Sequence, residues 1–201
     1  MANADRPSGL TPVCYRNGVP WTGGGRVYCI LDTEDTNAYA IGDPVTLAGG
    51  GDTNGVPTIT LATAGITNPV LGAILGMGGT KYGASYGDPT NLNTTIIPAT
   101  KTKNYYVLVA DDPNIVFEIQ EVSGGTALTQ AAIGLNAPLV AGTNNGYVSG
   151  WELNNAGEVT TATEQVRILG LAQRPGNAYG EHAKWLVYIN LHSYMIGQAG
   201  V

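Results

Sequence analysis

Apolar and polar residues alternate with a period of two over much of the chain, which is the pattern of β-strands that bury one face. In the segment 114–121, Ile115, Phe117 and Ile119 share one side, while polar residues such as Gln120 point to the other. This segment is therefore expected to be half buried. Similar strand signals recur at 27–31, 43–47, 56–62, 70–75, 105–109, 165–171 and 184–192.

Many short strands separated by turn residues predict a mainly β fold, namely a single antiparallel β-sandwich or barrel. Only the segment 126–133 favours a helix, with Thr126 as its N-cap and Gly134 as its stop, and this helix is about two turns long. Residues 1–25 contain three prolines and end in three glycines, which predicts an extended N-terminal arm. Residues 26–201 are expected to form one β domain.

Glycine-rich segments separate several of the predicted strands. They lie at 49–55 and over the longer stretch 76–93, which carries Tyr82 and Tyr86. A long loop of this kind in a compact domain is commonly functional or mobile. The sequence Asp-Asp-Pro-Asn at 111–114 lies between two predicted strands, and we interpret it as a hairpin turn in which proline fixes φ.

Composition narrows the classes of partner. The chain has 9 basic and 15 acidic residues, a formal net charge of −6, and only 12% charged residues. So few cations do not make a large phosphate-binding patch, and we expect no nucleic-acid partner.

The apolar run 69–77 is too short to span a bilayer, so no membrane partner is expected. The first nine residues lack the apolar stretch of a secretory signal, which favours folding in the cytoplasm of the producing cell.

The two cysteines, Cys14 and Cys29, are expected to remain reduced in that compartment, with a short disulfide loop as the alternative. Cys29 lies on the same face of its strand as Val27 and Leu31, which indicates a buried thiol.

The strongest sign of catalysis is the sequence Gly-Ala-Ser-Tyr-Gly at 83–87, which matches the G-x-S-x-G turn of hydrolases, with Ser85 as the nucleophile. Its context does not fit, because no strand leads into residue 83 and Asp88-Pro89 follows where a helix should begin. The segment 76–81 lacks the Gly-Lys-Ser/Thr order of a phosphate loop.

Metal-ligating residues are sparse in the sequence. The only histidines are His182 and His192, and the cysteines lie far from them along the chain. We therefore expect no enzymatic activity, no cofactor and no metal.

Several stretches of the chain resemble the capsid decoration (cement) proteins of tailed phages. They are residues 2–13, 17–21, 41–45, 54–58, 109–114, 117–120, 134–137, 167–170 and 183–187, with Asn177. The resemblance implies a non-enzymatic protein that is made in the host cytoplasm and binds the outside of a major capsid lattice, stabilising it against internal DNA pressure. The implied partners are the major capsid protein and neighbouring copies of the chain, in a dimer or trimer.

A protein of this kind needs weakly charged contact surface and segments that follow the contours of its partner. Tyrosine suits such contacts because it buries a large area and still forms hydrogen bonds. Addition of a strand to a neighbour's sheet edge is a related possibility. The candidate capsid-contact residues are Arg6, Leu10, Tyr15 and Trp21 in the arm, and Tyr82 and Tyr86 in the long loop.

Two other functions are compatible with a β fold that presents aromatic residues in loops. One is a glycan- or receptor-binding module on the virion surface. Sugar sites usually combine aromatic rings with clustered carboxylates or amides, and the sequence alone reveals no such cluster. The more distant alternative is a serine esterase that uses Ser85.

Overall fold

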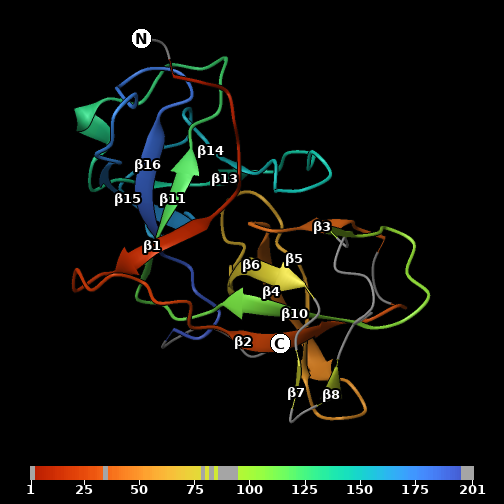
Figure 1. The fold of residues 1–201 in the computed structure, drawn as a ribbon. Coiled ribbons are helices and arrows are strands. Elements are labelled where there is room, and N and C mark those ends of the chain that lie inside the picture. Colours follow the sequence, from red (N-terminus) through yellow and green to blue (C-terminus); the bar gives the residue numbers. More distant parts are fainter. Residues whose placement is uncertain (1–2, 34–35, 78–79, 82–83, 86–94, 196–201) are drawn as a thin grey trace.

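The protein consists of two β lobes (Figure 1), as seen in a computed structural model that describes residues 3–33, 36–77, 80–81, 84–85 and 95–195. The first lobe is a five-stranded sheet in the order β1-β11-β16-β15-β12, which we call the sheet lobe. The second lobe is a closed barrel in the order β10-β2-β5-β4-β6. The predicted mainly β architecture is confirmed, although the chain builds a barrel and an open sheet rather than one of them.

All neighbouring strands in the sheet lobe are antiparallel. Phe117, Trp185 and Ile168 have no solvent exposure and lie in its core cluster. This core side follows the alternation of apolar residues along the sequence. The five strands of the sheet lobe are β1 (Thr11–Tyr15), β11 (Ile115–Gln120), β12 (Asn136–Ala137), β15 (Val166–Leu171) and β16 (Lys184–Ile189).

The barrel encloses a second apolar cluster, which includes Tyr28, Ile74 and Val107. Its strand pairs are antiparallel, except that β2 and β5 run parallel where Cys29 lies beside Thr58. The barrel strands are β2 (Arg26–Ile30), β4 (Pro44–Gly51), β5 (Pro57–Leu61), β6 (Gly72–Met77) and β10 (Tyr105–Ala110). Three two-stranded ribbons complete the described strands: β3 (Tyr39–Ala40) with β9 (Ile96–Ile97), β7 (Thr80–Lys81) with β8 (Ala84–Ser85), and β13 (Leu139–Val140) with β14 (Glu152–Leu153).

The predicted helix at 126–133 is wrong in extent and in its cap. The structure has a single turn of 3-10 helix, Gln130–Ala132, and Thr129 instead of Thr126 caps it by accepting a hydrogen bond from the Ala131 N–H. A two-turn helix is marginal on its own, and here the backbone forms only the tighter single turn.

The predicted hairpin at 111–114 is also wrong. A tight turn does form, since the Ile115 N–H donates to the Asp112 carbonyl oxygen at 3.1 Å. However, β10 before the turn belongs to the barrel and β11 after it belongs to the sheet lobe. The turn therefore carries the chain from one lobe to the other, which local alternation cannot distinguish from a hairpin.

Residues 3–25 do not form a separate arm. Residues 3–10 cross the sheet lobe as a strap, and Leu10 is only 1% exposed within the core cluster. Thr11–Tyr15 then pairs with β11 as an edge strand. Burial of Leu10 overturns its assignment as a capsid-contact residue, because the side chain already packs inside its own protein.

The expectation that the polar side of β11 faces solvent is wrong where the strap covers it. Gln120 has no solvent exposure, because its carboxamide oxygen accepts the Arg6 N–H at 2.8 Å and its amide nitrogen donates to Asp5 Oδ1 at 2.9 Å. Both faces of β11 are covered at this end, one by the core and one by the strap.

Three segments meet at a joint between the lobes, which consists of residues 8–10, 41–43 and 148–150. The Leu10 N–H donates to the Gly42 carbonyl oxygen at 2.9 Å, and the Ser149 N–H donates to the Ile41 carbonyl oxygen at 2.8 Å. Gly42 has a φ of 90°, and a Cβ at this position would overlap the Ser8 carbonyl oxygen. The close approach therefore requires glycine.

Gln165 forms a second connection between the lobes. Its side chain has no exposure, and it donates to the carbonyl oxygens of Thr63 (2.9 Å) and Asn68 (3.2 Å). Its own oxygen accepts the N–H groups of Gly65 (3.0 Å) and Leu139 (3.1 Å). Three of these four hydrogen bonds reach residues 63–68, which join barrel strands β5 and β6, so one buried amide ties the two lobes together.

Neither cysteine is in a disulfide, and Cys29 is fully buried while Cys14 is half-buried. Cys29 packs in a small apolar cluster together with Val27 and Leu31, so the predicted buried thiol is confirmed.

Candidate functional site

The sheet lobe turns one side to its core and the other side outward, and we call the second side the outer face. A row of paired residues crosses it over four strands: Cys14, Val116, Tyr188 and Arg167. The neighbouring row contains Glu118 and Leu186. Tyr188 and Leu186 are half-buried, and Leu169 is 41% exposed beside them at the irregularity in β15. The outer face therefore combines partly exposed apolar groups with polar groups on a rigid sheet.

Arginines border this apolar centre. The Arg16 guanidinium lies 4.5 Å above the Tyr188 ring centroid, and that of Arg167 lies 6.0 Å from it. Arg167 Nε also donates to Asn136 Oδ1 at 2.8 Å. Stacking on an aromatic ring holds a guanidinium in place without a carboxylate partner, so its charge remains available.

The other end of the outer face carries two more cations. Arg174 forms an ion pair with Glu118 at 3.0 Å, and Lys184 Nζ donates to the Arg6 carbonyl oxygen at 3.0 Å. Burial lowers the pKa of the Lys184 ammonium, while the carboxylate of Glu118 acts in the opposite direction. With Arg16 and Arg167, four of the nine cations of an acidic chain are gathered on one face, which makes it locally basic.

Both edge strands of the sheet lobe pair with a further segment. On one side, residues 11–21 form a hairpin, in which the Tyr15 N–H donates to the Val19 carbonyl oxygen and the Trp21 N–H donates to that of Val13. The returning strand contains Pro20, which has no N–H to offer a further strand.

The opposite edge strand, β12, exchanges two backbone hydrogen bonds with Val159. The barrel is closed and has no edge. Contact through side chains of the outer face is therefore favoured over the strand addition considered from the sequence.

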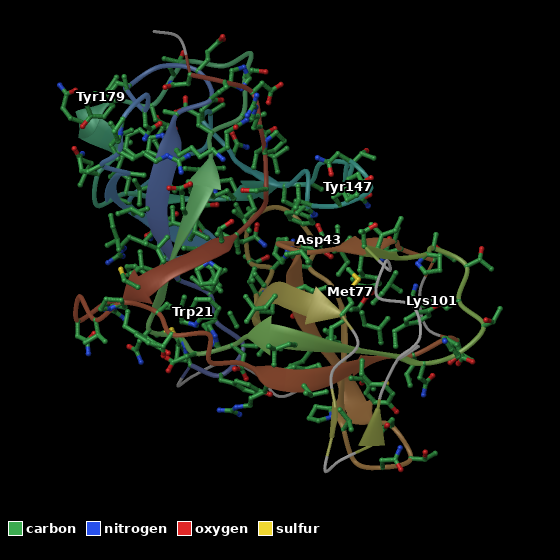
Figure 2. All side chains as sticks on the ribbon, in the orientation of Figure 1. Trp21, Asp43, Met77, Lys101, Tyr147 and Tyr179 are labelled. Carbon is green, nitrogen blue, oxygen red and sulfur yellow. The ribbon has the colours of Figure 1, made fainter. Side chains whose placement is uncertain are left out.

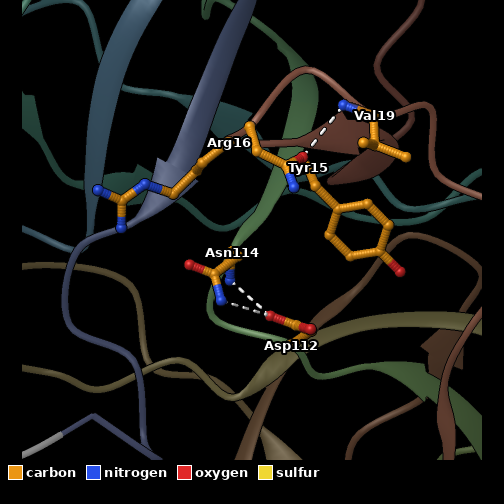
Figure 3. A pocket seen from close by; sticks show the side chains of 6 residues that line it. Tyr15, Arg16, Val19, Asp112 and Asn114 are labelled. Carbon is orange, nitrogen blue, oxygen red and sulfur yellow. Dashed lines mark hydrogen bonds between the residues drawn. The ribbon is translucent and has the colours of Figure 1, made fainter.

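A cleft of about 810 Å³ opens between the N-terminal hairpin and the 112–114 turn (Figure 3). Six residues line it: Tyr15, Arg16, Asn17, Val19, Asp112 and Asn114. The two groups come together because the Arg16 N–H donates to the Asn114 carbonyl oxygen at 2.8 Å. This clusters an aromatic ring, a carboxylate and two amides, which the sequence did not reveal.

A polar cluster under the strap brings together Asp5, Glu152 and His182, whose ligand atoms lie within 4.8 Å of one another and could hold a metal ion. The Gln120 amide nitrogen lies among them, 2.9 Å from Asp5 Oδ1 and from Glu152 Oε1. Burial raises the pKa of the Glu152 carboxyl. The amide donates to both carboxylates, and its bond to Asp5 holds the strap against β11.

The remaining candidate residues occupy different environments, and Trp21 is labelled in Figure 2. Trp21 is half-buried, packs against the core of the sheet lobe and donates through its indole N–H to the Gly24 carbonyl oxygen at 3.3 Å. Arg6 is exposed on the strap. Tyr82 and Tyr86 lie outside the described residues. The backbone of Ser85 belongs to β8 and pairs with Thr80.

Searches of protein-family models, curated proteins and solved structures find no match to this chain. Among the described residues, no helix is long and apolar enough to cross a membrane.

Proposed function

We propose that the protein is a structural component of a phage virion that binds the outer surface of the capsid lattice and stabilises it. The observation that carries this proposal is the outer face of the sheet lobe, which presents Leu169, Leu186 and Tyr188 beside the arginines Arg16 and Arg167. Tyrosine and arginine are enriched in protein interfaces, where they contribute large contact areas and hydrogen bonds. The resemblance of the sequence to decoration proteins supports the same function.

The positive charge of the outer face indicates the chemistry of the surface that it would bind. Guanidinium groups pair with carboxylates in bidentate geometry, so the expected partner surface is an acidic, partly apolar patch on the major capsid protein. Neighbouring copies of the chain, in a dimer or trimer, are the second kind of contact that we propose.

The stiffness of the molecule supports a stabilising role. A protein that braces a lattice must transmit force between its contacts without unfolding, and the joint at Gly42 and the buried Gln165 fix the two lobes against each other. The closed barrel and the Pro20 segment also limit association between free copies through their backbones.

The proposal is tested by co-sedimentation of the purified protein with capsids of the phage that encodes it, assembled without this protein. Wild type should bind saturably, and Arg16→Ala and Arg167→Ala should each weaken binding roughly fivefold or more, as expected for interface side chains that each contribute about 1 kcal/mol. Raising the salt concentration should weaken binding further, since the charges on the outer face are partly exposed.

Arg26→Ala is the matched control. Arg26 also lies over a tyrosine ring, that of Tyr194 at 5.8 Å, but it belongs to the barrel. It should bind capsids like wild type. Absence of co-sedimentation, or equal binding by all four proteins, would contradict the proposed function, provided that each variant unfolds at the wild-type denaturant concentration.

A further inference from the structure

The cleft beside the N-terminal hairpin differs chemically from the outer face. Its polar groups come from two segments about a hundred residues apart, and the hairpin and the interlobe turn hold them in place. An open hollow with a few convergent polar groups and an aromatic wall has the chemical features of a small-ligand site.

Three polar side-chain atoms in the cleft have no hydrogen-bond partner among the described residues. Asp112 Oδ1 accepts from the backbone N–H (2.8 Å) and side-chain amide (3.1 Å) of Asn114, and Asn17 Oδ1 accepts the Val19 N–H at 3.1 Å. These bonds fix the side chains and leave Asp112 Oδ2, Asn114 Oδ1 and Asn17 Nδ2 for a ligand. The cleft thus offers two acceptors and one amide donor at set positions.

Tyr15 supplies the aromatic wall. Its ring is half-buried, packing in part against the core of the sheet lobe, and β1 fixes its backbone by pairing with β11. The face of an aromatic ring is electronegative and attracts weakly positive C–H groups. Val19, which is 50% exposed, extends the apolar border of the cleft.

Arg16 is the one cationic residue in the lining of the cleft, and its guanidinium does not point into it. The Arg16 side chain turns away toward β16 and stacks on Tyr188 (Figure 3), and Asp112 is the charged group that remains in the cleft. An anionic ligand such as a phosphate is therefore disfavoured by repulsion from the carboxylate. A peptide strand is disfavoured as well, because the hairpin satisfies its own backbone groups.

We propose that this cleft binds a neutral saccharide. Hydroxyl groups of a sugar both donate and accept, so they match the carboxylate oxygen, the amide oxygen and the amide nitrogen that remain open. The C–H face of the same sugar ring stacks on Tyr15. This activity goes beyond capsid binding, and it gives a virion protein a means of contact with glycans on a cell surface.

Saturation-transfer NMR with glucose, galactose, mannose, N-acetylglucosamine and rhamnose as separate probes tests the proposal. At least one sugar should show saturable transfer, with a dissociation constant on the order of 1 mM, as suits a small open site. Asp112→Asn keeps an oxygen for the Asn114 hydrogen bonds but removes the carboxylate, and Tyr15→Leu keeps apolar bulk but removes the ring. Each should weaken binding at least about tenfold.

Tyr147→Leu is the control for loss of a tyrosine, because Tyr147 is 67% exposed on the 141–150 loop, outside the lining of the cleft. It should bind the sugar like wild type, and Asp112→Asn, at a residue outside the candidate capsid contacts, should still co-sediment with capsids. Absence of transfer from all five sugars, or sugar binding by the cleft variants that equals wild type, would overturn the saccharide site and leave the capsid proposal intact. Loss of capsid binding in Asp112→Asn, with its fold preserved, would overturn the saccharide site by assigning the cleft to the capsid contact.

Discussion

The joint between the lobes yields a prediction whose size follows from the structure. Gly42→Ala introduces a Cβ that overlaps the Ser8 carbonyl oxygen, at a φ of 90°. An L-residue in this region costs about 1–2 kcal/mol by itself. To relieve the overlap the strap must move, and with it Leu10, which is 1% exposed and whose loss from a core costs roughly 2–5 kcal/mol. The expected total is therefore about 3 kcal/mol or more.

Gly134→Ala provides the matched control, because Gly134 has a φ of 88° and a Cβ added there would meet no atom within 4 Å. It should cost only the backbone term, about 1–2 kcal/mol. Urea unfolding gives the loss in free energy of unfolding for each variant, and the difference between the two losses is the contribution of the joint. This difference should be at least about 2 kcal/mol, which corresponds to roughly 4–8 °C in Tm for a chain of this size.

Leu10→Ala adds a check on the mechanism. If Gly42→Ala acts by displacing Leu10, the double variant should be clearly less destabilised than the sum of the two single changes. Equal destabilisation by Gly42→Ala and Gly134→Ala, or full additivity with Leu10→Ala, would refute the reasoning that the strap is locked at this joint.

Two further predictions concern the thiols and pH. Cys14 should react with a thiol reagent in the native protein, and Cys29 should react only on unfolding, because Cys14 is half-buried and Cys29 is fully buried; rapid labelling of both thiols would contradict this. Burial lowers the pKa of the His192 imidazole below its ordinary value of 6.5. The unfolded chain therefore binds more protons in that window, and wild type should lose unfolding free energy relative to His192→Gln as the pH falls through 6.5. Parallel stability curves for the two proteins would show that His192 does not titrate in this way.

Local pattern predicts most of the longer strands, although it misses β1, and it does not predict which strands pair. The alternation of Ile115, Phe117 and Ile119 predicts β11 and its core face correctly. The same pattern cannot show that Gln120 is buried, because the covering residues Asp5 and Arg6 lie more than a hundred positions away along the chain.

The candidate sites depend on the same long-range contacts. The sequence predicts Tyr15 as a contact residue from its type alone, while its neighbours in the cleft, Asp112 and Asn114, have the local pattern of a hairpin turn. Arg16 is recognisable as part of a surface only because the fold places it on Tyr188. Extended segments rich in proline do not reveal whether they leave a domain or pack onto it, and the burial of Leu10 shows that this one packs.

The most direct test of the proposed function is a cryo-EM map of the virion of the phage that encodes this protein. The proposal predicts density for both lobes on the outside of the capsid at high copy number, with the outer face of the sheet lobe, around Tyr188 and Arg167, against the major capsid protein. Absence of the protein from the capsid exterior, or an orientation in which this face points to solvent, would contradict it.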